Sequence, residues 1–124
     1  MRFKLQKFKN VCKKLNNSKP IFIPESDPKN GKCEVIIMFI NERPGPKTIK
    51  TKIVSFDNPD PSAKLFKHLF LKTVGLKYRC HLFITNAIIW IPNERKARNY
   101  KPTKKELKDC VPILREQIEK IKPK

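Results

Sequence analysis

Two polar residues beside apolar runs are the positions in this sequence best suited to chemistry. Glu42 lies in the polar turn Asn41–Pro46, directly after the apolar run Val35–Ile40. In open α/β sheets, the turn after the carboxyl end of a strand is where ligands bind. Asn86 lies within a second apolar stretch, His81–Trp90, and a buried amide needs hydrogen-bond partners. The pattern indicates a polar site at strand ends, although a Glu in such a turn is more often a solvated carboxylate.

The four cysteines show no local metal or redox motif. Cys12, Cys33, Cys80 and Cys110 are widely spaced, without a CxxC pair. We expect no secretory signal, because residues 1–10 are interspersed with basic side chains and hold no apolar h-region. We therefore expect reduced thiols that serve mostly as small core residues.

The charge of the chain indicates a polyanionic partner. Its 29 Lys and Arg residues outnumber its 11 Asp and Glu residues, which gives a net charge of +18. Such a chain attracts nucleic acid by counterion release. The alternative is compositional bias in a proteome rich in Lys and Ile. No apolar run approaches the roughly 20 residues that span a bilayer, so we expect a cytoplasmic protein without a membrane partner.

The first part of the chain predicts a helix, a loop and a strand. Apolar residues recur at helical spacing over residues 2–15, among many basic side chains, which predicts a basic amphipathic helix. Residues 16–33 are rich in breakers and predict a loop, with Ile21–Ile23 as a candidate short strand. The run Val35–Ile40 is typical of a strand buried on both faces, as in a parallel sheet.

A connection, a helix and a second strand follow. Residues 47–59 show little regular pattern, and Asp60 then reads as an N-cap before a proline. The helix should end at Gly75. Its predicted apolar face consists of Leu65, Phe66, Leu69, Phe70 and Val74. The second buried strand is expected over residues 81–90.

The last predicted element is a capped helix. Thr103 and Glu106 form a capping box. Its predicted apolar stripe consists of Leu107, Cys110, Val111, Leu114, Ile118 and Ile121. Pro112 lies inside the stripe and should kink or split the helix.

The order of elements predicts an α/β fold. A strand, a helix and a strand joined by a long crossover form a parallel βαβ unit. We expect one domain over residues 1–124, in which a basic helix and loop at residues 1–32 precede the core. Two strands leave an uncovered hydrophobic edge, and the chain ends where another strand would follow. The expected fold is therefore an incomplete three-layer α/β/α arrangement with a parallel sheet.

Three stretches, in order, resemble motifs of the uracil-DNA glycosylase superfamily, most closely its iron–sulfur branch. The turn Asn41–Pro46 is similar to the first active-site motif, in which a strand ends in Gly-Glu-Ala-Pro-Gly. Leu82–Ile89 is similar to the second-strand motif, in which an asparagine ends an FITN element. Residues 101–124 resemble the helix that leads into the next strand. The resemblance extends over roughly residues 33–124.

The resemblance implies roles for five residues. Glu42 matches the carboxylate that activates water for attack on the sugar of an extruded deoxyuridine. Phe56 matches an aromatic that stacks on the flipped base, and Asn86 matches the amide that reads uracil. Pro44 and Gly45 match a tight turn that brings the backbone close to the nucleotide.

The chain departs from the motifs of the branch at its cysteines, at Asn41, where the motif begins with glycine, and at Arg43. The branch holds its cluster with four cysteines, whereas only Cys12 and Cys110 are candidates here, and Trp90 stands where a cysteine would follow the second motif. Two thiolates cannot hold a four-thiolate cluster, so the sequence predicts no cluster, no metal and no other cofactor. Arg43 replaces a small residue and would obstruct the nucleotide or contact its phosphate.

The resemblance also implies that catalytic parts are missing. The family carries a histidine motif and a DNA-wedging loop in its C-terminal half, whereas His68 and His81 lie on the predicted helix and strand start. We expect a chain truncated at its C-terminus, with little or no base release alone, whose fold a second polypeptide completes. The expected partner is uracil-containing DNA with a flipped base. The alternatives are a noncatalytic basic nucleic-acid-binding protein and a degenerate remnant that does not fold stably.

Overall fold

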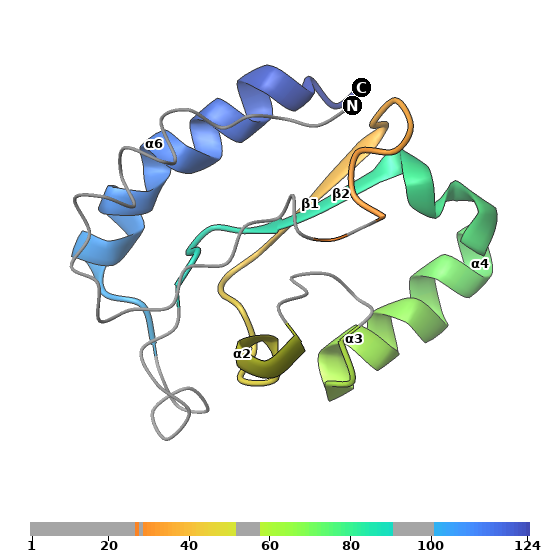
Figure 1. Cartoon of the computed structure of the whole chain (residues 1–124), viewed down its shortest axis with the longest axis horizontal. Helices are drawn as coiled ribbons and strands as arrows, with labels where there is room; N and C mark the ends of the chain where they lie inside the picture. The colour runs from red at the N-terminus through yellow and green to blue at the C-terminus, as the bar shows by residue number, and fades with distance from the viewer. Residues whose placement is uncertain (1–26, 28, 52–57, 91–100) are drawn as a thin grey trace.

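The computed structural model describes residue 27 and residues 29–51, 58–90 and 101–124 (Figure 1). Its elements are, in order, β1 (Ile37–Asn41), α2 (Thr48–Thr51), α3 (Pro61–Phe66), a π-helical segment (Lys67–Leu71), α4 (Lys72–Val74), a 3-10 helix (Leu76–His81), β2 (Leu82–Asn86) and α6 (Lys104–Ile121). The alternation of strands and helices confirms the predicted α/β class. The stretch 47–59, predicted to be irregular, holds the short helix α2.

The two strands pair in parallel, as predicted for a βαβ unit. Their register runs from Ile37 opposite Leu82 to Asn41 opposite Asn86. Both strands therefore end side by side, and the loops that follow them leave from the same edge of the sheet.

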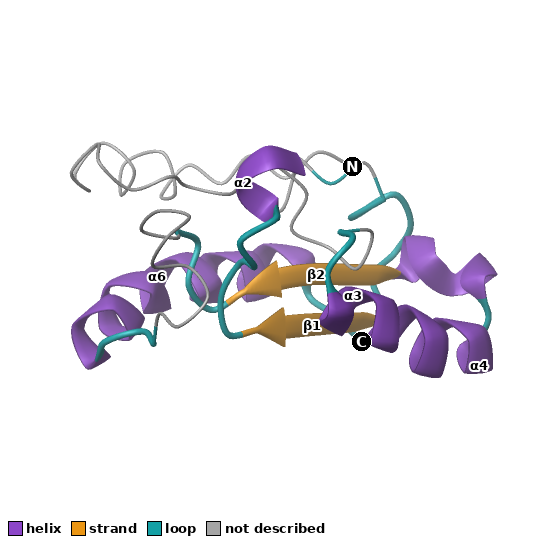
Figure 2. Cartoon of the chain, turned by 90° about the horizontal axis from the view of Figure 1, so that it is seen from below, coloured by secondary structure: helices purple, strands orange, loops and turns teal. Residues whose placement is uncertain are grey.

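The sheet lies between two helical layers. Successive side chains of a strand point to opposite faces. On one face, Phe83 packs with Val35 and with Ile121 of α6. On the other face, Ile84 packs with Ala63 of α3. Figures 1 and 2 show the strands between α6 and the α3–α4 helix, which is a three-layer arrangement.

The two strands differ in burial. Every residue of β2 is buried, and the side-chain amide of Asn30 bonds to both the N–H and the carbonyl of Ile84. In contrast, Ile36, Ile37 and Ile40 are 40–45% exposed. The prediction that this first strand is buried on both faces is therefore wrong. Among the described residues only β2 pairs with β1, so nothing there covers the outer edge of β1.

The helix that crosses from β1 to β2 begins and ends as predicted. Asp60 is the N-cap, and its Oδ1 accepts a hydrogen bond from the N–H of Ala63 at 2.8 Å. Pro61 occupies the first helical position, where no N–H is needed. The helix stops at Gly75, whose φ of +103° suits a residue without a side chain.

The apolar face of this helix is only partly the predicted one. Phe66 and Phe70 stack on each other and both meet Phe39 edge to face. The predicted members Leu65, Leu69 and Val74 are exposed, whereas Ala63 and Leu71 are buried. The physical reason is the π-helical segment, whose wider turn changes which residues face the sheet.

Helix α6 has the predicted capping box, with Thr103 and Glu106 bonded to each other's backbone N–H groups. It runs without interruption through Pro112, so the expected split does not occur. Pro112 is exposed, and the lost hydrogen bond is outweighed by packing on the buried side. That side consists of Glu106, Cys110, Ile113, Glu116, Gln117 and Ile121.

The predicted stripe of α6 is therefore rotated. Leu107, Val111 and Ile118 are exposed rather than buried. One cause is the carboxylate of Glu106, which turns inward and accepts a hydrogen bond from the indole of Trp90 at 3.4 Å. Trp90 is thus a packed core residue.

The cysteines contradict the expectation of reduced thiols. Cys33 and Cys80 form a disulfide. Their backbones are adjacent because both lie just before the start of the paired strands β1 and β2, where the N–H of Cys33 donates to the carbonyl of Cys80, a proximity that a separation of 47 residues hides in the sequence. Cys110 is buried, as a small core residue.

Several predictions lie outside the described residues: the basic helix over residues 2–15, the short strand Ile21–Ile23, and the roles of Phe56 and Cys12. Within the described parts of the chain, no helix is both long and apolar enough to cross a membrane.

Candidate functional site

A hollow lies at the edge of the sheet where both strands end. The register sets Asn41 directly opposite Asn86 at this edge. The loops beyond stay joined, because the N–H of Ala87 donates to the carbonyl of Asn41 at 2.7 Å and that of Ile88 donates to the carbonyl of Glu42 at 3.0 Å. The residues after β1 and after β2 are therefore held together as one rim.

The hollow has a volume of about 360 Å³, within the range of small-molecule sites. It is lined by Asn41, Arg43, Pro44, Gly45, Thr48, Asn58, Asp60, Ser62, Ala63, Phe66 and Asn86. The lining comes from both strand ends, from the turn after β1, from α2 and from the start of α3. It combines polar side chains with one aromatic ring.

Of the predicted side chains that could contact a base, Asn86 lines this hollow. It is 4% exposed and lies on the face of the sheet that α3 covers, two residues after Ile84. No hydrogen bond joins its side-chain amide to another residue of the described segments. A buried amide that borders a hollow can offer its donor and its acceptor to a ligand.

Glu42 lies at the same edge but in the adjoining hollow. Its side chain is exposed and, with Arg43, Lys47 and others, lines a second depression of about 590 Å³. The two hollows share Arg43, Gly45, Asp60 and Ser62. Glu42 and Asn86 are thus at one edge of the sheet and in neighbouring hollows.

The turn Pro44–Gly45 forms part of the wall of the first hollow, and Gly45 also lines the second. Pro44 is buried, and the carbonyl of Gly45 accepts the N–H of Thr48 at 3.0 Å, which starts α2. A Cβ at Gly45 would lie 3.7 Å from Oδ2 of Asp60, an ordinary contact. The φ of Gly45 is also not in the left-handed region. The described parts of the chain therefore place no steric demand for glycine here, and the missing side chain leaves space toward Asp60.

Asp60 is a site residue that the sequence analysis recognised only as a helix cap. Its Oδ1 is bound by the α3 backbone, whereas its Oδ2 faces Gly45. It borders both hollows. The signal in the sequence was an acidic residue directly before Pro61, which also fits a cap and therefore could not reveal a second role.

Polar side chains beside the hollow are joined by hydrogen bonds, of which the one between Asn58 and Thr48 is buried. The amide of Asn58 donates to Oγ1 of Thr48 at 3.1 Å, and its Oδ1 accepts a hydrogen bond from Thr51. The ammonium of Lys47 donates to the carbonyl of Pro59 at 2.6 Å. These bonds tie α2 to the segment before α3. Phe56, between them in sequence, lies outside the described residues.

Basic side chains border the two hollows. Arg43 lines both of them and donates to the carbonyl of Pro44 at 3.3 Å. Lys47 lines the second. Cations beside a polar hollow are suited to a ligand that carries phosphate groups.

The sequence matches a known protein family. Residues 28–124 match the family model described as "Uracil DNA glycosylase superfamily". The matched segment includes both strands, the rim of the hollow and α6. A search of curated proteins gives no match.

Proposed function

Because this chain belongs to the uracil DNA glycosylase superfamily, we propose that it accepts one pyrimidine base, extruded from DNA, in the hollow where β1 and β2 end. The observation that carries the proposal is the parallel register that sets Asn41 opposite Asn86. It brings the turn after β1 and the amide of Asn86 to the same hollow. Extrusion is required because a base inside a duplex exposes only its edges.

In this proposal Asn86 reads the base. Its amide supplies one donor and one acceptor, which suit the adjacent carbonyl and N–H groups of a uracil edge. Burial of the amide strengthens the discrimination, because a base that cannot pair with it leaves a buried polar group unsatisfied. Phe56 is proposed to stack on the base, in keeping with the resemblance of the chain to the family.

Glu42 is proposed to act on the sugar rather than on the base. Support comes from its position in the hollow beside that of Asn86, at the same edge. A carboxylate there can take a proton from water and stabilise positive charge on the sugar as the bond to the base weakens. The reaction class is hydrolysis of an N-glycosidic bond in DNA.

DNA is the proposed partner, held mainly through its phosphates. Support comes from the net charge of +18 and from Arg43 and Lys47 beside the hollows. Such binding weakens steeply as salt rises, because it depends on counterion release.

A second polypeptide is proposed to complete the sheet along β1. Support comes from Ile36, Ile37 and Ile40, which are exposed on a strand that has one strand partner among the described residues. An added strand would pair the unpaired N–H and C=O groups of this edge and pack its own side chains beside the exposed ones. The resemblance implies that the added part also brings a histidine that stabilises the departing base, so the chain alone should release little uracil.

The test compares binding and base release by the purified full chain. Oligonucleotides with one deoxyuridine or one deoxycytidine, single-stranded or mismatched in a duplex, would be bound at several salt concentrations. We expect a preference for deoxyuridine, which Asn86→Ala lowers about tenfold or more, since such a contact is worth about 1–3 kcal/mol. Binding to DNA without uracil should not change.

Glu42→Gln should instead spare binding and abolish any uracil release. The matched control is Glu119→Gln, which removes an exposed carboxylate on α6. Equal affinity of the unaltered chain for both oligonucleotides would leave a noncatalytic, salt-dependent DNA-binding protein. Rapid uracil release by the chain alone would contradict the need for a second polypeptide.

A further inference from the structure

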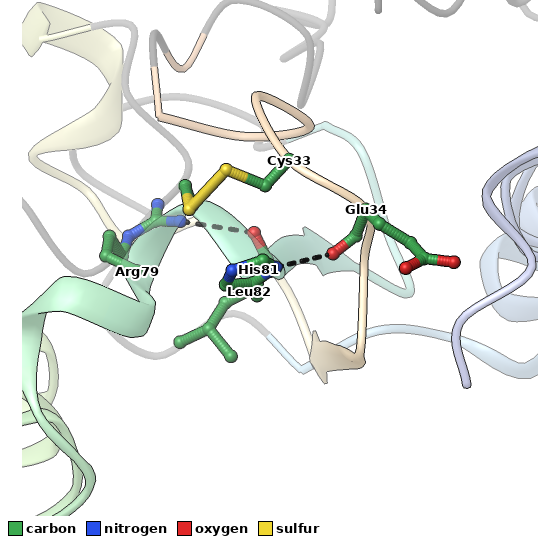
Figure 3. The surroundings of a disulfide bond; sticks show 6 residues. Cys33, Glu34, Arg79, His81 and Leu82 are labelled. Atoms are coloured by element: carbon green, nitrogen blue, oxygen red, sulfur yellow. Dashed lines mark hydrogen bonds between the residues drawn. A yellow bond between two sulfur atoms is a disulfide. The ribbon is translucent and has the colours of Figure 1, made fainter.

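The opposite edge of the sheet carries a cluster with the chemistry of a metal site. Cys33 precedes β1, while Cys80 and His81 directly precede β2 (Figure 3). One ligand atom from each of the three residues lies within 4.8 Å of the others. None of them is fully buried, so the cluster can exchange with solvent.

The backbone holds these residues together independently of the disulfide. The N–H of Cys33 donates to the carbonyl of Cys80 at 3.2 Å, and the N–H of Ile36 donates to the carbonyl of His81 at 2.8 Å. The parallel pairing of β1 with β2 continues from there. Reduction of the sulfur–sulfur bond would therefore leave both thiols and the imidazole facing one another.

One nitrogen of the His81 imidazole is engaged by the backbone. Its Nδ1 lies 2.9 Å from the backbone carbonyl of Glu34 (Figure 3). A carbonyl oxygen only accepts, so Nδ1 carries the proton in this contact. A neutral imidazole then presents the lone pair of Nε2, and metal-binding histidines are commonly oriented by such a hydrogen bond to a carbonyl.

We propose that Cys33, Cys80 and His81 form a redox-gated site that binds a thiophilic divalent cation such as Zn²⁺ when the disulfide is reduced. A dithiol reductant gives two electrons and two protons to the sulfurs, breaks their bond and becomes a disulfide itself. Binding of the cation then releases both thiol protons and forms two metal–sulfur bonds and one metal–nitrogen bond. Two thiolates and an imidazole are a known Zn²⁺ donor set that leaves a fourth position open.

The surrounding charge is compatible with this donor set. A cavity of about 350 Å³ reaches Cys80 and is lined by Lys29, Lys32, Lys67, Leu71, Lys77 and Arg79. Cationic neighbours repel a bare divalent cation. Two thiolates carry a charge of −2, which cancels the charge of the cation, so the bound complex adds no net positive charge to the site. The same cations favour thiolates over thiols, and the cavity gives a small dithiol access to the disulfide.

The site differs from an iron–sulfur cluster, which needs four thiolates. The sequence analysis predicted no metal because the four cysteines lack a CxxC pair and only Cys12 and Cys110 were candidates for the cluster. The pairing of β1 with β2 brings Cys33, Cys80 and His81 together, although their spacing in the sequence gives no sign of it.

The test titrates the full chain with Co²⁺ after anaerobic reduction with a phosphine. The control background is Cys12→Ser with Cys110→Ser, which keeps only the proposed ligand cysteines. We expect one Co²⁺ per chain, with thiolate charge-transfer and tetrahedral d–d absorption that Zn²⁺ removes. The oxidised chain should show neither band.

Variants separate metal binding from the disulfide. Cys33→Ser and Cys80→Ser should each abolish the thiolate bands. His81→Gln should still form the disulfide under oxidation, which shows that it folds, while its reduced form binds Co²⁺ about tenfold or more weakly. Absence of the bands in the reduced control, or bands that survive Cys33→Ser, would overturn the proposal. DNA takes no part, so the outcome is independent of the proposed function.

Discussion

The two edges of the sheet, one where β1 and β2 begin and one where they end, carry different chemistry. At the carboxyl edge, Asn41 and Asn86 lie opposite each other, and the loops beyond leave a polar hollow of about 360 Å³. At the amino edge, Cys33 and Cys80 lie before the starts of the two strands and are covalently joined. One edge is open to a ligand, and the other is closed on itself.

The comparison teaches that two paired strands can place chemistry at both edges while a covalent bond closes only one of them. The hollow depends on hydrogen bonds such as those of Thr48 and Asn58. The closed edge adds a covalent bond to its backbone hydrogen bonds. We therefore expect changes at the amino edge to act on stability and changes at the carboxyl edge to act on ligand selection.

The largest expected effect is removal of the covalent link. The double variant Cys33→Ser with Cys80→Ser, compared with the oxidised chain without metal, should lose about 2–4 kcal/mol of unfolding free energy. The reason is that the disulfide closes a loop between positions 47 residues apart and restricts the unfolded chain. Chemical denaturation measures the loss.

Under conditions in which this double variant is folded, it should keep its preference for deoxyuridine over deoxycytidine. A preference that disappears from a folded variant would show that the two edges are coupled. The comparison between an open and a closed edge would then fail.

A smaller effect is expected at Asp60, which combines a cap with a place in the hollow. Asp60→Ala should lower stability by about 1 kcal/mol, because the N–H of Ala63 loses its acceptor. Asp60→Asn should keep the stability, since asparagine caps equally well. Thermal melting of both variants measures the cap, and a destabilised Asp60→Asn variant would mean that its charge, not its cap, supports α3.

The smallest effect on stability is expected at Gly45. Gly45→Ala should change the unfolding free energy by less than about 0.5 kcal/mol, because the added Cβ would meet only Oδ2 of Asp60 at 3.7 Å. The same substitution should lower the deoxyuridine preference, since it fills space in the hollow. Melting and DNA titration of one preparation separate the two effects. A marked loss of stability would assign Gly45 a structural role.

The edge of the sheet that carries the hollow could be predicted from the sequence, whereas the hollow that each side chain lines could not. Glu42 and Asn86 follow or end apolar runs, and parallel strands end at one edge, so their proximity followed from the pattern. Which hollow each side chain enters depends on the direction of each Cβ. That direction put Asn86 inside and Glu42 in the neighbouring depression.

The cysteine pair shows where local patterns give no signal. Cys33 and Cys80 have no motif spacing, and their meeting depends on the register of strands joined by a long crossover. The caps at Asp60 and Thr103 were predicted correctly because a cap involves only its own next three residues. Contacts within one turn can be predicted from sequence, whereas a disulfide between two cysteines on either side of a long crossover has no local signal.

The π-helical segment Lys67–Leu71 has a consequence for how this sequence can change. Its wide turn accommodates one surplus residue between Phe66, which lines the hollow, and Leu71, which anchors the helix in the core. Deleting a single residue there would restore an ordinary α-helix while Phe66 and Leu71 keep their faces, because the wide turn holds the extra residue without rotating the helix on either side of it. The aromatic wall of the hollow would stay against Phe39, so the chain length can change at this point without altering the hollow.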